Sequence, residues 1–540
     1  MPTTILYNGA IYTLDPAQPR AQALAIRDGR VIAVGSQGKV QAAVGRQVES
    51  INLQGRAAIP ALTDAHVHLI WHALARRSVQ LDGIADFEQA LRVIETAAKS
   101  GTGWLQGGGW DHTLWNGRWP TAADLDAIVP DRPVLLSRKD GHAAWLNSAA
   151  LRIAAIDNTT PDPVGGSIRR EQGQPTGVLY ETAIDLARRH IPEPTEAERL
   201  DAVRDAITEA HSYGMVGMHI PTGMRPGDGS MHMHDLQTLR DRGQLPLRCL
   251  QYLGLDGLDD ALHMGLRSGF GDRWLRIGGV KMFADGTLGS ETAEMLAPYE
   301  GSTGRGLATL PTEELNEAIR RSIAGGLSVM VHAIGDLANR KVLDAIEAAL
   351  PGAPSGPHGT ARHAPARIPN RIEHCQLLHP DDIPRFAQLG VVASMQPIHA
   401  TSDMLTADRL WGSRCETAYA WRRLQEAGAH LAFGSDAPVE SLNPWLSVHA
   451  AVTRQRADGT PRGGWYASQC LSVEEALCGF TAGSAFAAGA EAEQGSLAPG
   501  KLADIAVLSD DPFKVDPSEL HRIHATMTLL EGELVWEQKP

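Results

Sequence analysis

The chain has 540 residues, of which 43% are hydrophobic, so it can bury a large core and is expected to form more than one domain. Its net charge of -14 argues against a nucleic-acid partner, because duplex binding depends on a basic surface that neutralises phosphates. No apolar run reaches the length of about 18 residues that a membrane span requires, so the composition fits a soluble enzyme with a small-molecule substrate.

The N-terminal residues MPTTILYNGAIYTL contain no basic region and no long apolar core, so they do not predict a secretory signal. The five cysteines are scattered and form no CxxC pair, which is typical of reduced thiols. We therefore expect a cytoplasmic protein with no nucleic-acid or membrane partner. A homo-oligomer is a usual arrangement for a large soluble enzyme of this kind.

Both ends of the chain predict β-strands. ILYNGAIYTL and AQALAIRDGRVIAVG alternate apolar with polar residues, and Asn8-Gly9 is favoured at a hairpin turn because both residues tolerate positive φ. The last fifty residues have the same pattern. Because chain ends often meet at a surface, we predict one small β-sandwich formed from both termini, residues 1–57 and 489–540.

The middle of the chain alternates apolar runs with helical segments such as 312–326 and 380–389. This alternation indicates a parallel sheet, and eight such units indicate an α/β fold with a (β/α)8 TIM-like barrel, beginning in residues 58–83 and completed in 212–488. The predicted barrel strands share an apolar, β-branched run that ends at a loop-forming residue; they lie near 58–66, 215–221, 247–253, 275–284, 328–333, 370–374, 391–396 and 430–436.

The interval between the first and second predicted barrel strands is too long for one crossover. Residues 84–211 combine helical stretches with strand-like runs such as PVLLSRKDGHAAWLNS. We predict an inserted α+β domain at this position.

Side chains that can bind metals recur where predicted strands end, which in a (β/α)8 barrel is the mouth of the active site. They are His66 and His68 in TDAHVH, Lys281 in GGVKMFADG, His332 in VMVHAIGD, His374 in RIEHCQ and Asp436 in AFGSDAP.

His66 and His68 are two residues apart, and positions i and i+2 of a strand share a face, so both imidazoles can reach one metal. The alternative to a metal site is that the His-x-His sequence occurs by chance. A lone histidine at a strand end, such as His332 or His374, is more often structural than a ligand, but two in successive units favour a shared site. A carboxylate at Asp436 can bind a metal and also act as a base.

Lys281 lies in an apolar run, where a buried cation is costly. One interpretation is an ion pair with Asp285 or another carboxylate. The other is a carbamate formed with carbon dioxide, which turns the lysine into an anionic bridging ligand; desolvation lowers the pKa of a lysine and favours this reaction. The residues alone leave both open.

Several blocks occur in an order that resembles the amidohydrolase superfamily, within it the amidohydrolase-3 group of YtcJ-like and N-substituted formamide deformylase-like hydrolases. The blocks include TDAHVHL, GHAAWLNS, GVKMFADGTLGS, VHAIGD, RIEHCQ, ASMQPIHA, GSDAPVE and GSLAPGKLADIAVL. The resemblance covers nearly the whole chain and implies a barrel with a two-part β-sandwich and a metal centre at the strand ends.

The resemblance implies two metal sites, with His66, His68 and Asp436 at one, His332 and His374 at the other, and carbamylated Lys281 between them. Zinc suits these ligands; one metal instead of two, or another divalent ion, stays open. The implied reaction is cleavage of an amide or N-substituted formamide by a metal-activated hydroxide, with Asp436 as general base and acid. Alternatives are hydrolysis of a cyclic amide or carbamate, deamination of a ring, or an inactive binding protein on the same fold.

Three further residues are candidates for substrate contacts. His142 and His399 lie in blocks that the amidohydrolase-3 group shares, and each is otherwise a hydrogen-bonded structural histidine. Trp110 lies in the glycine- and tryptophan-rich segment 105–119, which predicts either an apolar wall for substrate or a packed aromatic cluster in the insert. No G-x-S-x-G elbow or phosphate-binding loop is present, which disfavours a serine hydrolase.

Overall fold

The computed structural model describes residues 3–44, 48–99, 101–138, 143–163, 165–223, 227–350 and 368–539. They belong to two compact units, which we call the main unit (Met1–Leu69 with Arg204–Pro540) and the inserted unit (Ile70–Val203). The helix α2 (Leu69–Ala75) begins at the first boundary, and α7 (Glu196–Ser212) includes the second.

The main unit contains a sheet of eight parallel strands in the order β6-β13-β14-β15-β16-β17-β18-β19, which confirms the predicted barrel. The strands are β6 (Leu62–Asp64), β13 (Met215–Ile220), β14 (Arg248–Gly254), β15 (Leu275–Phe283), β16 (Ser328–Ala333), β17 (Arg371–His374), β18 (Val392–Met395) and β19 (Leu431–Phe433). All six residues of β16 are buried, as expected for parallel strands that are covered on both faces.

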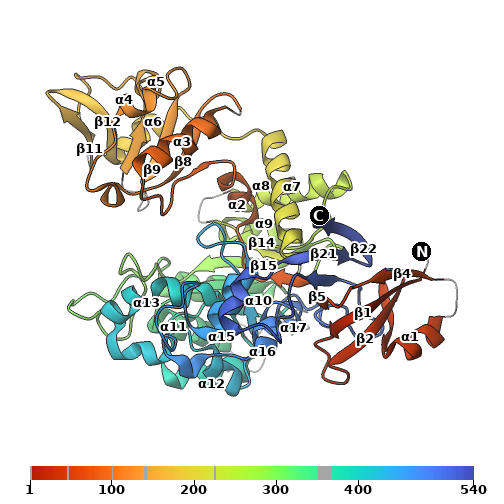
Figure 1. Cartoon of the computed structure of the whole chain (residues 1–540). Coiled ribbons are helices and arrows are strands. Elements are labelled where there is room, and N and C mark those ends of the chain that lie inside the picture. Colours follow the sequence, from red (N-terminus) through yellow and green to blue (C-terminus); the bar gives the residue numbers. More distant parts are fainter. Residues whose placement is uncertain are drawn as a thin grey trace. The chain divides into compact units, whose positions relative to one another are not determined.

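Helices connect and cover these strands (Figure 1). They are α8 (Asp228–Asp241), α9 (Leu258–His263), α10 (Thr312–Ala324), α11 (Asp336–Ala349), α12 (Ile383–Leu389), α13 (Pro397–Trp411), α14 (Trp421–Glu426), α15 (Pro444–Thr453), α16 (Val473–Gly479) and α17 (Ala482–Ala487). The predicted helix 312–326 corresponds to α10, and the predicted 380–389 is a 3-10 turn followed by α12. Within the described ranges, no helix combines the length and apolar character needed to cross a membrane.

The prediction of one strand over residues 58–66 was wrong in detail. The segment forms β5 (Ala57–Pro60), which belongs to a different sheet, and then β6 in the barrel. The chain passes from one sheet to the other at Ala61, whose N–H donates to Asp504 O at 2.9 Å. Pro60 has no amide hydrogen, which suits the end of a strand rather than its middle.

Both ends of the chain build that other sheet, which confirms that the termini form a shared β-structure. Its order is β22-β21-β20-β5-β1-β2-β3, and β4 also pairs with β1. Figure 1 shows red and blue strands side by side here, because β20 from the C-terminal end is antiparallel to β5. The remaining members are β1 (Thr4–Tyr12), β2 (Arg20–Arg27), β3 (Arg30–Gly35), β4 (Glu49–Asn52), β20 (Ile505–Leu508), β21 (Ala525–Leu530) and β22 (Glu533–Glu537).

The alternation along β2 gives this terminal sheet two apolar faces. Leu24 and Ile26 belong to one buried cluster, whereas Ala23 and Ala25 pack in another with Val40 of α1 (Gln37–Val44). Successive residues of a strand point to opposite faces, and here the residues on both faces are apolar. The alternation of apolar and polar residues expected for the N-terminal segment is therefore not strict in β2. Both faces are covered.

An ion pair of low exposure joins the terminal sheet to the barrel. Arg248, the first residue of β14, donates to both carboxylate oxygens of Asp504 at 2.9 and 3.0 Å and to Glu531 at 3.0 Å. A bidentate arginine–carboxylate pair fixes the geometry of both partners. The two parts of the main unit are therefore held by side chains as well as by the continuous backbone at Ala61.

The inserted unit has its own six-stranded sheet, with the order β11-β12-β10-β9-β8-β7. Its strands are β7 (Val79–Gln80), β8 (Leu105–Trp110), β9 (Val134–Arg138), β10 (Ala143–Leu146), β11 (Gly166–Glu171) and β12 (Gln174–Glu181). Its helices are α3 (Phe87–Ala98), α4 (Ala122–Asp126), α5 (Ser148–Ile153) and α6 (Asp185–Arg188). The unit has a separate core rich in aromatic side chains, including Phe87, Trp110, Trp115 and Trp145.

Candidate metal centre

The loop that follows β6 carries the His-x-His pair and is fixed by Asp64. Asp64 Oδ1 accepts the backbone N–H of His66 at 2.9 Å and that of Ser435 at 3.0 Å. Gly434 permits this close approach, since a Cβ there would lie 2.4 Å from the backbone nitrogen of His66. The first and last strands of the barrel therefore meet where the candidate ligands lie.

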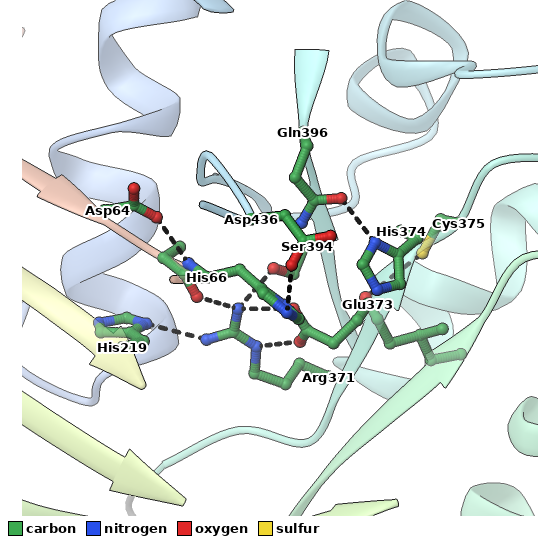
Figure 2. Close-up of polar contacts among 12 residues, drawn as sticks. Asp64, His66, His219, Arg371, Glu373, His374, Cys375, Ser394, Gln396 and Asp436 are labelled. Atoms are coloured by element: carbon green, nitrogen blue, oxygen red, sulfur yellow. Dashed lines mark hydrogen bonds and ion pairs between the residues drawn. The ribbon is translucent and has the colours of Figure 1, made fainter. Parts of the chain in front are cut away.

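His66, His374 and Asp436 form a compact cluster in which one potential ligand atom from each lies within 4.8 Å of the others. Figure 2 shows the three side chains converging from the ends of β6 and β17 and from the loop after β19. His68 also faces this cluster: His68 Nε2 is 3.3 Å from Asp436 Oδ1, and His66 Nε2 is 3.4 Å from the same oxygen. Both histidines of the His-x-His pair thus face the same carboxylate oxygen, Asp436 Oδ1, which is distant from them in the sequence.

Two atoms of the cluster need a partner that the described residues do not supply. His66 Nε2 and Asp436 Oδ1 are buried, and neither has a hydrogen-bond partner among the described residues. Leaving a buried polar atom unsatisfied costs free energy, and most such atoms in proteins have a partner. A divalent cation would satisfy both, so the donor set fits a metal ion.

The protonation states suit metal binding as well. His66 Nδ1 donates to Glu373 Oε2, and His374 Nδ1 donates to Gln396 Oε1 at 2.8 Å, so each ring keeps the lone pair of Nε2 free. Burial lowers the pKa of His66 to about 4 and that of His374 well below its usual value, so both imidazoles are neutral.

Asp436 supplies the negative charge. Burial alone would raise its pKa, but the imidazoles of His66 and His68 hold the pKa of Asp436 well below its usual value. His374 and Asp436 have φ angles of 73° and 59°, in the left-handed region that residues with a side chain rarely adopt. Such backbone strain concentrates at functional sites.

His332 lies beside this cluster without belonging to the three-residue group. Its ring centroid is 4.6 Å from that of His374, and its Nε2 donates to Gly286 O at 3.0 Å. The free nitrogen of this ring is therefore Nδ1. The structure places His332 next to the other predicted ligands with a different nitrogen available.

Lys281 is almost completely buried, and burial lowers the pKa of its amino group to about 8. Its Nζ lies 4.8 Å from the ring centroid of Phe283. Among the described residues, none forms a hydrogen bond or ion pair with this amino group. Asp285, the partner in one interpretation of the sequence, instead accepts the backbone N–H groups of Ile334, Gly335 and Glu294.

The three predicted substrate contacts have different outcomes. His399 lies beside the cluster, with Nε2 3.8 Å from Asp436 Oδ2. Trp110 is fully buried in the inserted unit and donates its indole N–H to Leu136 O at 2.7 Å, which is the packed aromatic cluster that the sequence left as an alternative. His142 lies outside the described residues.

Three residues that contact the candidate ligands or each other were not predicted from the sequence: Arg371, Glu373 and Gln396 (Figure 2). A signal for two of them was present. Arg371 and Glu373 are charged residues at i and i+2 of a strand that is buried on both faces, so their side chains share a face and must satisfy each other.

The profile of the amidohydrolase family matches residues 49–536. The chain is 34% identical to the Bacillus subtilis (strain 168) protein YtcJ, an amidohydrolase by name, over 99% of both chains. It is 28% identical to the N-substituted formamide deformylase of Arthrobacter pascens, over 99% of this chain and 98% of the relative.

The crystal structure of an uncharacterized metal-dependent hydrolase from Pyrococcus furiosus is also similar. The two share 31% sequence identity with a TM-score of 0.75, and the match covers 95% of this chain and 100% of the other. This structural similarity agrees with the barrel described above. The resemblance seen in the sequence motifs is thereby confirmed: this chain belongs to the amidohydrolase family.

Proposed function

We propose that this protein is a metal-dependent hydrolase that cleaves a non-peptide C–N bond in an amide or N-substituted formamide. The strongest support is the pair of buried atoms His66 Nε2 and Asp436 Oδ1, which lie 3.4 Å apart and lack hydrogen-bond partners among the described residues. The relative from Arthrobacter pascens, named for cleavage of N-substituted formamides, supports the choice of bond.

We assign His66, His68 and Asp436 to one zinc ion and His332 and His374 to a second. Zinc is bound well by imidazole and carboxylate ligands, and its catalytic sites keep a position open for water. The imidazoles of His66 and His374 are neutral, as ligands must be.

Lys281 would bridge the two ions as a carbamate. The unprotonated amine forms a new N–C bond to carbon dioxide and releases one proton, which leaves an anionic carbamate in place of the neutral amine. Burial of Lys281, its lowered pKa and the absence of an ion pair among the described residues all favour this reaction.

The two oxygens of Asp436 face different neighbours, which suggests two roles. Oδ1 faces His66 and His68, whereas Oδ2 faces His399 at 3.8 Å. The chemistry that a divalent cation supplies at such a site is that of a Lewis acid, which acidifies water and polarises a carbonyl. Asp436 would use Oδ2 to accept the proton of the attacking water and then deliver it to the leaving nitrogen.

His399 and Gln376 would bind the amide group of the substrate. Gln376 Nε2 donates to His399 Nδ1 at 3.4 Å, so the proton of His399 lies on Nε2. His399 Nε2 and Gln376 Oε1 are buried and have no hydrogen-bond partner among the described residues. The first would donate to the substrate carbonyl and the second would accept its N–H.

The test is metal content by elemental analysis of protein purified without chelator, combined with assays of formate release from N-substituted formamides and of ammonia or amine release from amides and ring amines. Asp436→Asn should bind less metal and lose turnover. Asp382→Asn is the matched control, because Asp382 is a buried carboxylate that pairs with Arg340 away from the cluster. Release of ammonia from ring amines alone would indicate a deaminase, and protein without metal or turnover would indicate a binding protein.

A further inference from the structure

Arg371 and Glu373 form an ion pair in the interior of the barrel, and neither side chain is exposed to solvent. Arg371 Nε donates to Glu373 Oε1 at 2.5 Å, and one terminal nitrogen donates to Glu373 Oε2 at 3.2 Å. The carboxylate is therefore held in two places by the same guanidinium, which is the most directional ion pair available to it.

The guanidinium is itself fixed by neighbouring strands (Figure 2). Arg371 donates to Ala65 O at 2.7 Å, to His219 Nδ1 at 2.9 Å and to the hydroxyl of Ser394. These partners lie at the end of β6, on β13 and on β18, while Arg371 is on β17. The position of Glu373 is thus set by four of the eight barrel strands.

The other face of Glu373 meets His66. Oε2 accepts the proton of His66 Nδ1, and the opposite ring nitrogen, Nε2, is the one that faces Asp436. An acceptor at Nδ1 fixes the tautomer and the ring orientation, and a charged acceptor raises the electron density at the other nitrogen. His374 has an equivalent but neutral acceptor in Gln396.

We propose that Arg371 and Glu373 are positioning residues that orient His66 and strengthen its bond to a metal ion. The inference rests on the proposed function, since it takes His66 as a ligand. A purely stabilising role is a weaker explanation, because the cost of desolvating two charges offsets most of the gain from their attraction, and apolar replacements of buried pairs are often neutral. A role in orienting His66 explains why the pair is charged, because a carboxylate is a stronger acceptor for His66 Nδ1 than a neutral group.

The first test is Glu373→Gln, which keeps the size of the side chain and an oxygen acceptor but removes the charge. We expect the dissociation constant for zinc, measured by competition with a chelator, to rise by about 10- to 100-fold. The cobalt-substituted protein should also change its visible absorption spectrum, which reports the ligand field at the metal and which a purely stabilising role would not alter.

Asp504→Asn is the matched control. Asp504 and Arg248 form another bidentate ion pair of low exposure, at the junction with the terminal sheet, so this variant loses an equivalent charge away from His66. It should lower thermal stability and leave both the zinc dissociation constant and the cobalt spectrum unchanged. An equal weakening of zinc binding in both variants would overturn the proposal.

Glu373→Gln leaves Arg371 as an unpaired buried cation, so the double variant Arg371→Met with Glu373→Leu is needed if the single variant does not fold. It removes both charges and should still bind zinc weakly; zinc binding at the wild-type level would overturn the proposal. Failure of the proposed function is distinguishable, because the wild-type protein would then bind no metal. If the wild-type protein binds zinc and Glu373→Gln binds it with the same dissociation constant, only the positioning role is rejected.

Discussion

The carboxylate of Asp64 accepts the backbone N–H of Ser435 at 3.0 Å and thereby ties the first barrel strand to the loop after the last one. Backbone bonds reinforce this connection: Ala65 N–H donates to Phe433 O at 2.9 Å, and Asp436 N–H donates to His66 O at 2.7 Å. The same bonds therefore close the barrel and bring the candidate metal ligands His66 and Asp436 together.

We predict that Asp64→Ala lowers the free energy of unfolding by about 1–3 kcal/mol, because two buried N–H groups lose their acceptor. Chemical denaturation of the metal-free protein measures this. Ser484→Ala is a suitable comparison, since its hydroxyl also bonds across this region, to Thr63 O at 3.2 Å, but satisfies no buried N–H. An Asp64→Ala variant as stable as the wild type would show that the backbone bonds alone close the barrel.

Removal of the metal should both abolish turnover and destabilise the fold. A ligand that binds only the native state stabilises it by about 4 kcal/mol when present at about a thousand times its dissociation constant. We expect dialysis against a chelator to lower the thermal midpoint and formate release together, and added zinc to restore both. Full turnover of protein shown to be free of metal would contradict the proposed function.

Replacement of Lys281 should cause the loss of one of the two proposed metal ions. We predict that Lys281→Ala lowers the zinc content from about two ions per chain to about one, because the bridging anion is lost. Short carboxylic acids should restore part of the turnover by occupying the space of the carbamate. Reconstitution of wild-type apoprotein should be faster with bicarbonate than without it. Unchanged zinc content in Lys281→Ala would mean that the lysine is not a ligand.

Gln376 should affect substrate binding more than metal binding. Gln376→Leu removes the unsatisfied oxygen and the hydrogen bond to His399 while keeping a similar volume. Loss of an amide contact costs about 1–3 kcal/mol, so we expect kcat/KM for the substrate to fall by about 5- to 150-fold with unchanged zinc content. A fall in zinc content would instead place Gln376 in the support of the metal centre.

His211 makes the fold sensitive to acid independently of the metal centre. It is buried, its Nε2 donates to Pro246 O at 2.8 Å, and burial lowers its pKa to about 4. The unfolded chain binds a proton at this residue below pH ~6.5 while the folded protein does not, so stability falls as the pH decreases from about 6.5 to about 4.

The contribution of His211 over this range is about 3 kcal/mol. His211→Gln retains a donor for Pro246 but cannot be protonated, so we expect the difference in unfolding free energy between pH 7 and pH 5 to be smaller in the variant. Urea denaturation at both pH values, with metal-free protein, measures this. Parallel pH profiles for the two proteins would contradict the assignment.

Much of the site was predictable because its residues end strands, and strand ends of a barrel share one edge. His66 and His68 were expected on a strand, but β6 ends at Asp64, and a loop brings both rings to Asp436. The sequence pattern therefore placed His66 and His68 near Asp436, as the structure does, while suggesting a different local geometry.

The contact between Glu373 and His66 was not predictable, because these residues are 307 positions apart and meet only when the barrel closes. Trp110 shows the opposite limit. Its segment was compatible with both a substrate wall and a packed cluster, and the choice depends on neighbours such as Trp145 that are close only in the folded unit. Local patterns specify chemistry and secondary structure, whereas long-range packing decides which side chains face each other.

The pairing of β5 with β20 has a consequence for biosynthesis. β5 immediately precedes the first barrel strand, whereas β20 begins at Ile505, so β5 is synthesised long before its partner strand. Arg248 likewise has its ion-pair partners, Asp504 and Glu531, in a part of the chain that is synthesised much later. Until Glu531 has been synthesised, the nascent chain therefore has an unpaired edge at β5 and an arginine without its carboxylate partners, and the main unit cannot be completed.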